Sequence, residues 1–523
     1  FTKYDAFGRV AYTGKCSFIR HMGREFWQQL SYHNTNLYES RHPRQALIAS
    51  GQLEIDYTNT ALFSNNIEHL EIYTVNYYDD YNFDLRGLQA EASSIYTSNL
   101  NNGNFTTNTK TLATGGHVRV LGTDQWITSL TKYDDKARAI YTHSINEYLN
   151  SEIKTHSKLN FIGEVLETTT THDKNGLNST NINIVDKFTY DHAGRLLKQT
   201  QNINQQGEEL IVFNHYDELG QLIEKKVGGS DTQSDYNQTT ALQDVAYNYN
   251  IRGWLTEINK VDAPNPDQLF AFKLNYNKPE DNATTTALYN GNISETHWRS
   301  QNTHNQKRSY AYHYDALNRI KAADYLTPHA MTGLFDGELE NFSLSNISYD
   351  YNGNIMGLRR YGAKQDHSIG IIDQLDYTYQ PNSNQLKAVN DTADDEGFKD
   401  GSHKAAYDYT YDVNGNMTHD KNKAITHIDY NHLNLPTKVI FNTSGYQNRE
   451  ISYIYDATGV KLKKIVNTGT FLQDDTANLG TITHTQYDNG FIYEYSGNNS
   501  PQLKFFSHPE GYLQPDNQGG FDY

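Results

Sequence analysis

The sequence predicts an all-β fold, built as a long strip of antiparallel β-hairpins. Three observations predict it: a recurring five-residue motif, a period-two alternation before each copy, and an apolar content too low for one thick core. The motif, Tyr-Asp-x-x-Gly, occurs intact six times. These copies supply the repeat-defining structural residues: Tyr4, Asp5 and Gly8; Tyr190, Asp191, Gly194 and Arg195; Tyr216, Asp217 and Gly220; Tyr349, Asp350 and Gly353; Tyr411, Asp412 and Gly415; Tyr455, Asp456 and Gly459.

The residues before each motif copy have the alternation of a half-buried strand. In one example, Tyr407, Tyr409 and Tyr411 fall on one face, and polar residues occupy the positions between them. The same alternation precedes Tyr314 and Tyr455. A strand is therefore expected to precede every copy of the motif, and we call the turn at each copy a corner.

The motif itself predicts a tight turn. An Asp side chain accepts a backbone N–H two residues further on, and glycine adopts positive φ at little cost. A second strand then leaves the turn, as in Arg195–Lys198 and Gln221–Glu224. Degenerate copies place Ala137, Asn318, Asn434 and Gly253 in the glycine position.

The spacing of the repeats favours one open strip over a strict solenoid. Successive anchor tyrosines are 19 to 38 residues apart, so loops of unequal length join the hairpins. Because a hairpin cannot bury its own face, neighbouring hairpins are expected to pair edge to edge. Tyrosine suits this sheet, since its ring packs across strands while its hydroxyl stays in contact with water.

The composition excludes several classes of protein. Apolar residues make up 36% and charged residues 20% of the 523 positions, which favours a thin, surface-rich wall. An aromatic content of 13% and a net charge of −18 argue against disorder and against nucleic acid as a partner. No apolar stretch is long enough for a transmembrane helix. The single Cys16 excludes a disulfide framework and suits an exported protein.

Three regions are expected along the chain. Residues 1–130 are divergent hairpins that cap or plug the strip, residues 131–495 form the strip itself, and residues 496–523 follow it. The one predicted helix lies at 86–96. Stretches 97–117, 227–244 and 391–405 are rich in small polar residues and are expected to be long exposed loops.

At this level the sequence resembles the RHS/YD-repeat family, whose core is Tyr-Asp-x-x-Gly-Arg-Leu. Residues 190–196 match it at every fixed position, and residues 4–10 differ only in Val10. The segments 249–255, 290–298 and 430–436 resemble the branch of large exported proteins found in Bacteroidota. The resemblance implies a strip that spirals into a hollow shell, or part of one. In many members this shell encloses a C-terminal toxin.

The sequence departs from the family in one respect. The family's self-cleaving core centres on an Asp-Pro step, and this chain contains no Asp-Pro dipeptide. The segment 506–512 resembles the approach to that associated core, which is expected to begin after Tyr523 in a longer precursor. Neither a self-cleaving core nor a toxin is located within these residues.

We expect no catalytic, cofactor-binding or metal-binding residues. Asp350-x-Asn352-Gly353-Asn354 and the copy at 412–416 superficially resemble the start of a calcium loop, but neither has the Glu and flanking helices of an EF-hand. A tight turn is the favoured interpretation, and a surface calcium ion bridging turns is the alternative.

The other side chains with reactive chemistry also favour structural roles. His215, His313, His427 and His432 flank strands, and His508 lies in a turn, with no metal-ligand spacing among them. No Gly-x-Ser-x-Gly elbow is present, and no pair of acids is singled out for glycoside hydrolysis. Packing in the sheet is favoured over sugar stacking for the four tryptophans: Trp27, Trp126, Trp254 and Trp298.

The predicted function is structural. We expect a non-enzymatic shell segment of a large exported RHS/YD-repeat protein, with no cofactor, that encloses or delivers a C-terminal polypeptide cargo of the same precursor. The alternatives are a cell-surface adhesin or glycan-binding repeat array, and export cargo bound to a secretion channel such as that of type 9 secretion. The expected location is extracellular or at the cell surface.

Overall fold

The computed structural model describes residues 1–16, 24–33, 36–41, 47–48, 53–61, 70–88, 105–174, 181–280, 285–327, 340–400, 407–442, 446–471, 480–516 and 518–522. Nearly all regular structure in these ranges is antiparallel β-strand, which confirms the predicted fold class. The chain divides into two compact units. The first unit comprises Phe1–Ile211, Ser452–Val466 and Thr481–Tyr523, and the second comprises Val212–Ile451 and Asn467–Gly480.

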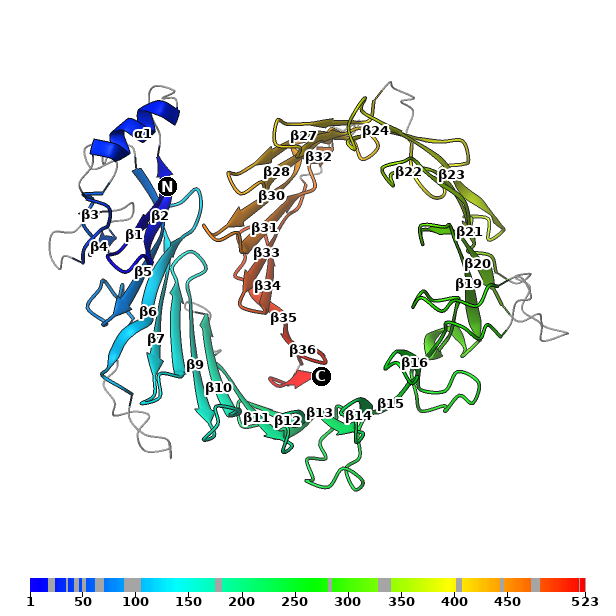
Figure 1. The fold of residues 1–523 in the computed structure, drawn as a ribbon, viewed down its shortest axis with the longest axis horizontal. Coiled ribbons are helices and arrows are strands. Elements are labelled where there is room, and N and C mark those ends of the chain that lie inside the picture. Colours follow the sequence, from blue (N-terminus) through cyan, green and yellow to red (C-terminus); the bar gives the residue numbers. More distant parts are fainter. Residues whose placement is uncertain are drawn as a thin grey trace. The chain divides into compact units, whose positions relative to one another are not determined.

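The first unit contains an N-terminal series of strands that pair in chain order (Figure 1). The series consists of β1 (Thr2–Tyr4), β2 (Val10–Cys16), β5 (Leu70–Asp79), β6 (Thr109–Arg119), β7 (Trp126–Tyr133), β8 (Ala139–Asn146), β9 (Ser151–Leu159), β10 (Val165–Lys174), β11 (Ile182–Tyr190) and β12 (Leu196–Ile203). Between β2 and β5 in the sequence, two short strands form a separate antiparallel pair: β3 (Leu47–Ile48) and β4 (Glu54–Ile55).

A C-terminal series completes the first unit, again paired in chain order. It consists of β33 (Ile482–Asp488), β34 (Phe491–Ser496), β35 (Gln502–His508), β36 (Gly511–Pro515) and β37 (Phe521–Asp522). Three strands cross the boundaries between the units: β13 (Glu208–Tyr216), β30 (Arg449–Tyr455) and β31 (Lys461–Asn467).

The second unit repeats the hairpin architecture. Its first series pairs consecutively from β14 to β24. These strands are β14 (Leu222–Val227), β15 (Gln243–Tyr249), β16 (Leu255–Ile258), β17 (Phe270–Asn275), β18 (Glu295–Ser300), β19 (Arg308–Tyr314), β20 (Ile320–Leu326), β21 (Leu344–Tyr349), β22 (Ile355–Ala363), β23 (Ile369–Tyr379) and β24 (Leu386–Asp391). A 3₁₀ turn, η3 (Gln301–Thr303), joins β18 to β19.

The remaining strands of the second unit continue the pattern. They are β25 (Tyr409–Tyr411), β26 (Met417–Asp420), β27 (Ile425–Tyr430), β28 (Pro436–Phe441), β29 (Tyr446–Gln447) and β32 (Thr470–Phe471). Strands β25 to β28 pair in chain order, and β29 pairs with β32.

The sequence predicted a helix at 86–96, whereas the helix that the structure describes lies elsewhere in the chain. That helix is α1 (Arg24–His33), in the first unit. At the predicted position, Arg86 and Gly87 have φ of 43° and 90° and form a turn, a conformation that an α-helix does not contain. The rest of the predicted helix, residues 89–96, lies outside the described residues.

The three loop predictions had different outcomes. Within 97–117, residues 97–104 lie outside the described residues, but β6 begins at Thr109, so the second half is strand. The stretch between β14 and β15 is a loop as expected. In 391–405, Asp391 ends β24 and Asp400 is buried, so this part of the loop is not fully exposed, and residues 401–406 are not described.

Apolar burial among the described residues occurs in separate clusters, three in the first unit and one in the second. The largest contains stacked rings, with Tyr77 centred 5.8 Å from Tyr57 and 4.3 Å from Phe83. A second cluster joins Ile182, Ile184 and Ile203 of the N-terminal series to Phe491 and other residues of the C-terminal series. A sheet strip with this distribution has no single thick core, in agreement with its low apolar content.

The first unit therefore brings residues from both ends of the chain together. Besides the shared cluster, the backbone N–H of Leu121 donates to the carbonyl of Tyr455 at 2.9 Å, and the N–H of Ala457 donates to the carbonyl of Arg119 at 2.8 Å. Val120 and Asp456 form an isolated antiparallel bridge. No helix among the described residues is long and apolar enough to cross a membrane.

Candidate functional site

The candidate site is the repeated corner, because it contains every residue that the sequence singled out. In all six intact copies, the Asp N–H donates to the carbonyl four residues later, and the Gly N–H donates back to the Asp carbonyl. The Asp Oδ1 accepts the backbone N–H four residues later at 2.8 to 3.0 Å. Each glycine has φ between 75° and 95°. These bonds close the turn as the sequence predicted.

The glycine is required for its backbone conformation and not for space. A Cβ on Gly8 or Gly353 would meet no atom within 4 Å. The positive φ alone disfavours other residues. The degenerate copies have the same conformation, with φ of 62° at both Ala137 and Asn318.

The second carboxylate oxygen is bound in two alternative ways. In the arginine type, Arg195 Nε donates to Asp191 Oδ2 at 2.6 Å, and Asp5, Asp134 and Asp315 are bound in the same way. In the asparagine type, Asn354 Nδ2 donates to Asp350 Oδ2 at 2.8 Å, and the corner at 412–416 is equivalent. The backbone N–H and side chain of Arg195 hold the pKa of Asp191 below the usual value, and the side chain and backbone N–H of Asn354 do the same for Asp350.

The strand register shifts at the anchor tyrosine in five of the six intact copies of the motif. Tyr190 pairs with Leu196, and Tyr349 pairs with Ile355, six residues downstream across the corner. The same six-residue offset and the same bulge occur at Tyr4, Tyr216 and Tyr411. The residue after each corner is thus held opposite its anchor tyrosine.

The residue after the corner also accepts a hydrogen bond: the hydroxyl of the next anchor tyrosine donates to its backbone carbonyl. Tyr349 OH donates to the Ile320 carbonyl at 2.7 Å, and Ile320 pairs with Tyr314 of the preceding corner. We call this bond the tyrosine staple. Nine staples occur among the described residues: Tyr78 to Val10, Tyr190 to Val165, Tyr249 to Leu222, Tyr276 to Leu255, Tyr314 to Ile293, Tyr349 to Ile320, Tyr379 to Ile355, Tyr411 to Leu386 and Tyr430 to Met417.

The staple adds to what the sequence predicted for the tyrosines. Their hydroxyls were expected to be able to stay in contact with water, and the stapled ones also donate to backbone, as Tyr349 does through an exposed bond. Burial raises the pKa of Tyr190, Tyr314 and Tyr349 above the usual value, so these phenols keep their proton at neutral pH. The preference for tyrosine over phenylalanine at the anchor follows from this bond.

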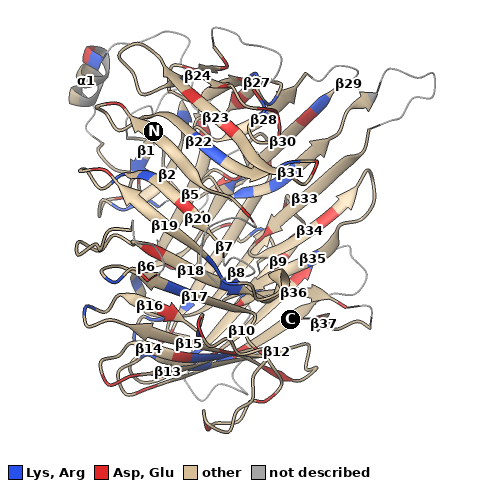
Figure 2. Ribbon diagram, turned by 90° about the vertical axis from the view of Figure 1, so that its right-hand side faces the viewer, with Lys and Arg blue, Asp and Glu red and all other residues tan. Residues whose placement is uncertain are grey.

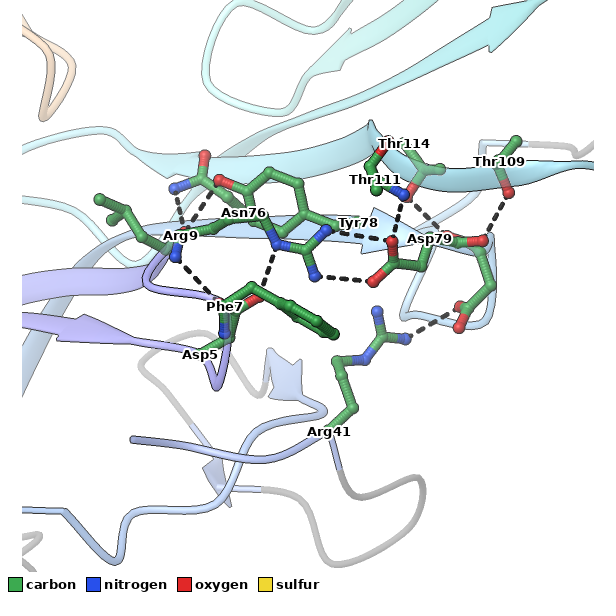
Figure 3. A network of polar contacts seen from close by, with 12 residues as sticks. Asp5, Phe7, Arg9, Arg41, Asn76, Tyr78, Asp79, Thr109, Thr111 and Thr114 are labelled. Carbon is green, nitrogen blue, oxygen red and sulfur yellow. Dashed lines mark hydrogen bonds and ion pairs between the residues drawn. The ribbon is translucent and has the colours of Figure 1, made fainter. Parts of the chain in front are cut away.

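The first corner shows how the parts combine (Figure 3). Arg9 Nε donates to Asp5 Oδ2, and its two terminal nitrogens donate to both oxygens of Asp79, at 3.0 and 2.7 Å. The guanidinium carbon lies 4.3 Å from the ring centroid of Tyr78, which staples Val10. The corner arginine thus supports the stapling tyrosine of the next strand pair by a cation–π contact.

Asparagine side chains link neighbouring corners in the second unit. Asn352 and Asn354 both donate to Asn384 Oδ1, at 3.2 and 2.9 Å. Asn414 and Asn416 donate to Asn434 Oδ1 in the same way. Sequence reasoning missed this link, although asparagines at the second and fourth positions after the corner Asp were a visible signal.

The polar side chains weighed as metal ligands have hydrogen-bond partners nearby. Asp350 Oδ1 and Oδ2 accept three N–H donors of their own turn, which favours the turn interpretation over a calcium loop. His313 bonds Asp324 at 2.9 Å and His427 bonds Asp429 at 2.9 Å. Within the described ranges, no group of three or more candidate metal ligands converges.

The tryptophans were expected to pack in the sheet. Trp126 is fully buried in the first unit, and Trp298 stacks on Tyr310 with ring centroids 5.5 Å apart. Trp254 is half-buried against Tyr276 and lines a pocket of about 590 Å³. The side chain of Trp27 lies outside the described residues.

Acidic and basic residues are interspersed along the strands (Figure 2). Many pair locally, as Lys273 does with Asp262 at 2.7 Å and with Glu280 at 2.8 Å. Charges of both signs therefore alternate over the part of the chain that the structure describes, and local ion pairs balance many of them.

No family model matches the chain, and no curated protein matches it. Solved structures similar to it include a crystal structure of TcdB2-TccC3, at 11% identity and a TM-score of 0.41, covering 98% of this chain and 28% of that one. Another is a Tc holotoxin pore of Photorhabdus luminescens, at 12% identity and a TM-score of 0.41, covering 85% of this chain and 23% of that one. The chain thus spans about a quarter of the length of these solved chains.

Proposed function

We propose that this chain is a non-enzymatic wall segment of the shell of a large exported RHS/YD-repeat protein, and that the shell encloses a polypeptide cargo of the same precursor. The observation that carries the proposal is the tyrosine staple, which ties neighbouring hairpins together at nine places among the described residues. A strip cross-linked in this way resists separation of its strands without a thick core. The motif residues 190–196 and 4–10 support the family assignment.

The chemistry of the corners supports a structural role. In the corners of the arginine and asparagine types, both oxygens of the carboxylate are bound by N–H donors of the same turn. A general acid needs a raised pKa and access to a substrate, whereas hydrogen bonds lower the pKa of Asp191, Asp315 and Asp350. The residues that recur most often in the sequence therefore build the wall.

The wall also suits a polypeptide cargo. Its apolar side chains are buried in small separate clusters, and polar side chains such as Gln199, Thr200 and Gln201 occupy buried positions. A surface without large continuous apolar patches holds a chain without binding it tightly. The proposed location is extracellular or at the cell surface, and the proposed partners are the cargo and the export machinery.

Limited proteolysis of the precursor tests this proposal. The precursor that contains this chain carries an epitope tag at its C-terminal end and is digested with thermolysin. We expect the tagged segment to survive as long as the strip does, and to be degraded at once after urea opens the strip. The isolated C-terminal segment serves as the control. Degradation of the tagged segment at the same rate in the intact precursor and in the isolated segment contradicts enclosure.

A second candidate, glycan binding, rests on the pocket beside Trp254. Tyr276 and Tyr289 also line it, and Tyr289 is 67% exposed. Aromatic rings beside amide side chains are a common basis for sugar recognition. Glycan-array binding that is lost in Trp254→Ala and Tyr289→Ala would favour this function. Binding that both variants retain would exclude this pocket.

A further inference from the structure

A second pocket, of about 330 Å³, lies within the first unit. Strands β10, β11 and β12 form one side of it, and the β33–β34 turn together with β35 and the residue after it forms the other. Its polar lining includes Asp186, Gln199, Gln201 and His508. The repeat corners are not among its lining residues, and no sequence motif predicted it.

The acidic group of the pocket is positioned by two amides. Gln199 and Gln201 both donate to Asp186 Oδ1, at 3.0 and 2.9 Å. Gln201 is 4% exposed, and its own Oε1 has no hydrogen-bond partner among the described residues. A buried carbonyl oxygen without a donor is costly, so this position favours the entry of a hydrogen-bond donor.

The charged side chain in the lining of the pocket is the acidic Asp186. No lysine or arginine is among the described residues that line it, and His508 is the other titratable side chain there. Burial raises the pKa of Asp186 and lowers the pKa of His508. Asp186 is half-buried, and the titratable neighbour that favours its charged form among the described lining residues is His508, whose own charged form burial disfavours. An incoming cation would therefore compensate the carboxylate further.

The apolar part of the lining is aromatic. Phe188, Phe491 and Phe506 line the pocket, and the last two rings are centred 5.1 Å apart. Aromatic rings attract cations, and a planar guanidinium stacks on them while its N–H groups remain free to donate. Carboxylate, amide oxygen and aromatic rings together match one ligand class.

We propose that this pocket binds the guanidinium of an arginine side chain, with Asp186 and Gln201 as acceptors and the phenylalanine rings as its walls. The proposal deepens the proposed function, because it makes the occupant an arginine of the enclosed polypeptide. A volume of about 330 Å³ has room for one side chain and is too small for a folded polypeptide.

Calorimetric titration of the 523-residue chain with N-acetyl-arginine amide tests the pocket. N-acetyl-citrulline amide is the matched neutral probe. We expect the arginine amide to bind, the citrulline amide to bind at least tenfold more weakly, and Asp186→Asn to weaken arginine binding at least tenfold. Asp366→Asn, an exposed turn variant, should bind as the parent does. Equal binding of both probes, or unchanged binding by folded Asp186→Asn, overturns the proposal.

A second variant covers the case in which Asp186→Asn fails to fold. His508→Lys adds a cation to the pocket lining without removing either glutamine bond, and should abolish arginine binding. Retained binding overturns the proposal. The result is separable from the shell proposal: arginine binding without protease protection of the cargo contradicts enclosure alone, and protection without arginine binding contradicts the pocket alone.

Discussion

Tyr349 donates its hydroxyl proton to the backbone carbonyl of Ile320 over 2.7 Å, and Ile320 is the strand partner of Tyr314 in the preceding corner. One side chain therefore connects two successive repeats at the same point where the corner sets the register. Arg319 lies over the Tyr349 ring at 4.4 Å, which holds the stapling side chain in place. The repeat is thus a mechanical unit with three parts: a corner, a supporting arginine or asparagine, and a staple.

Ala137→Gly is expected to stabilise the chain. Ala137 occupies a corner at φ 62°, where an alanine costs about 1–2 kcal/mol and a glycine does not. The greater freedom of glycine in the unfolded chain offsets part of this gain, which leaves about 0.5–1 kcal/mol. Urea unfolding followed by circular dichroism measures the shift.

Gly353→Ala is the converse control for that prediction. A Cβ at Gly353 would meet no atom within 4 Å, so any loss of stability comes from the backbone alone. A destabilised Ala137→Gly, or an unaffected Gly353→Ala, would be inconsistent with the conformational account of the corner.

The corners are expected to make the chain sensitive to acid. Hydrogen bonds lower the pKa of Asp191, Asp315 and Asp350 in the folded state. Their stabilising contribution is therefore complete above the unfolded value of about 3.9 and is lost as the pH falls through the lowered folded values. Thermal unfolding measured from pH 7 to pH 2.5 should show a midpoint that falls below about pH 4.

Asp350→Asn should reduce that dependence. The natural Asn250 corner shows that an amide oxygen accepts the same two backbone N–H groups, at 2.9 and 3.1 Å. The variant should fold and lose less stability between pH 5 and pH 3 than the parent. An identical acid profile for parent and variant would count against this corner as a source of the dependence.

Arg319→Ala is expected to lower the free energy of unfolding by about 1 kcal/mol, since it removes the bond to Asp315 and the contact with Tyr349. Arg319→Asn should recover part of this loss, because Asn354 makes the equivalent bond to Asp350 at 2.8 Å. Urea unfolding of the two variants provides the comparison. Equal losses in both would show that the corner bond is not restored by asparagine.

The hairpin fold could be predicted from the sequence because its determinants are local. The Asp and Gly of each motif fix a turn within five residues, and the tyrosine alternation fixes the strand that precedes it. The staple could not be predicted in the same way, since Tyr349 and Ile320 lie in different repeats and their contact depends on the register between strands. The asparagine link between Asn354 and Asn384 depends on the same register.

The N-terminal part and the second pocket were less accessible to sequence reasoning for a different physical reason. Strand β6 contains Gly115 and Gly116 and lacks the tyrosine alternation, so its polar composition favoured a loop. A Cβ at Gly115 would lie 2.4 Å from the Ser129 carbonyl oxygen, which shows that close strand packing selects glycine there. The pocket joins residues near 186 and 508, and no pattern within either segment indicates the other.

The most direct test of the account is the removal of staple hydroxyls without change of ring packing. Tyr349→Phe, Tyr379→Phe and Tyr411→Phe are combined in one variant, and Tyr351→Phe, at a fully exposed tyrosine, is the control. Each lost hydrogen bond should lower the free energy of unfolding by about 1 kcal/mol, and the control should be unchanged. A triple variant that unfolds at the same urea concentration as the parent would contradict the claim that tyrosine staples hold the strip together.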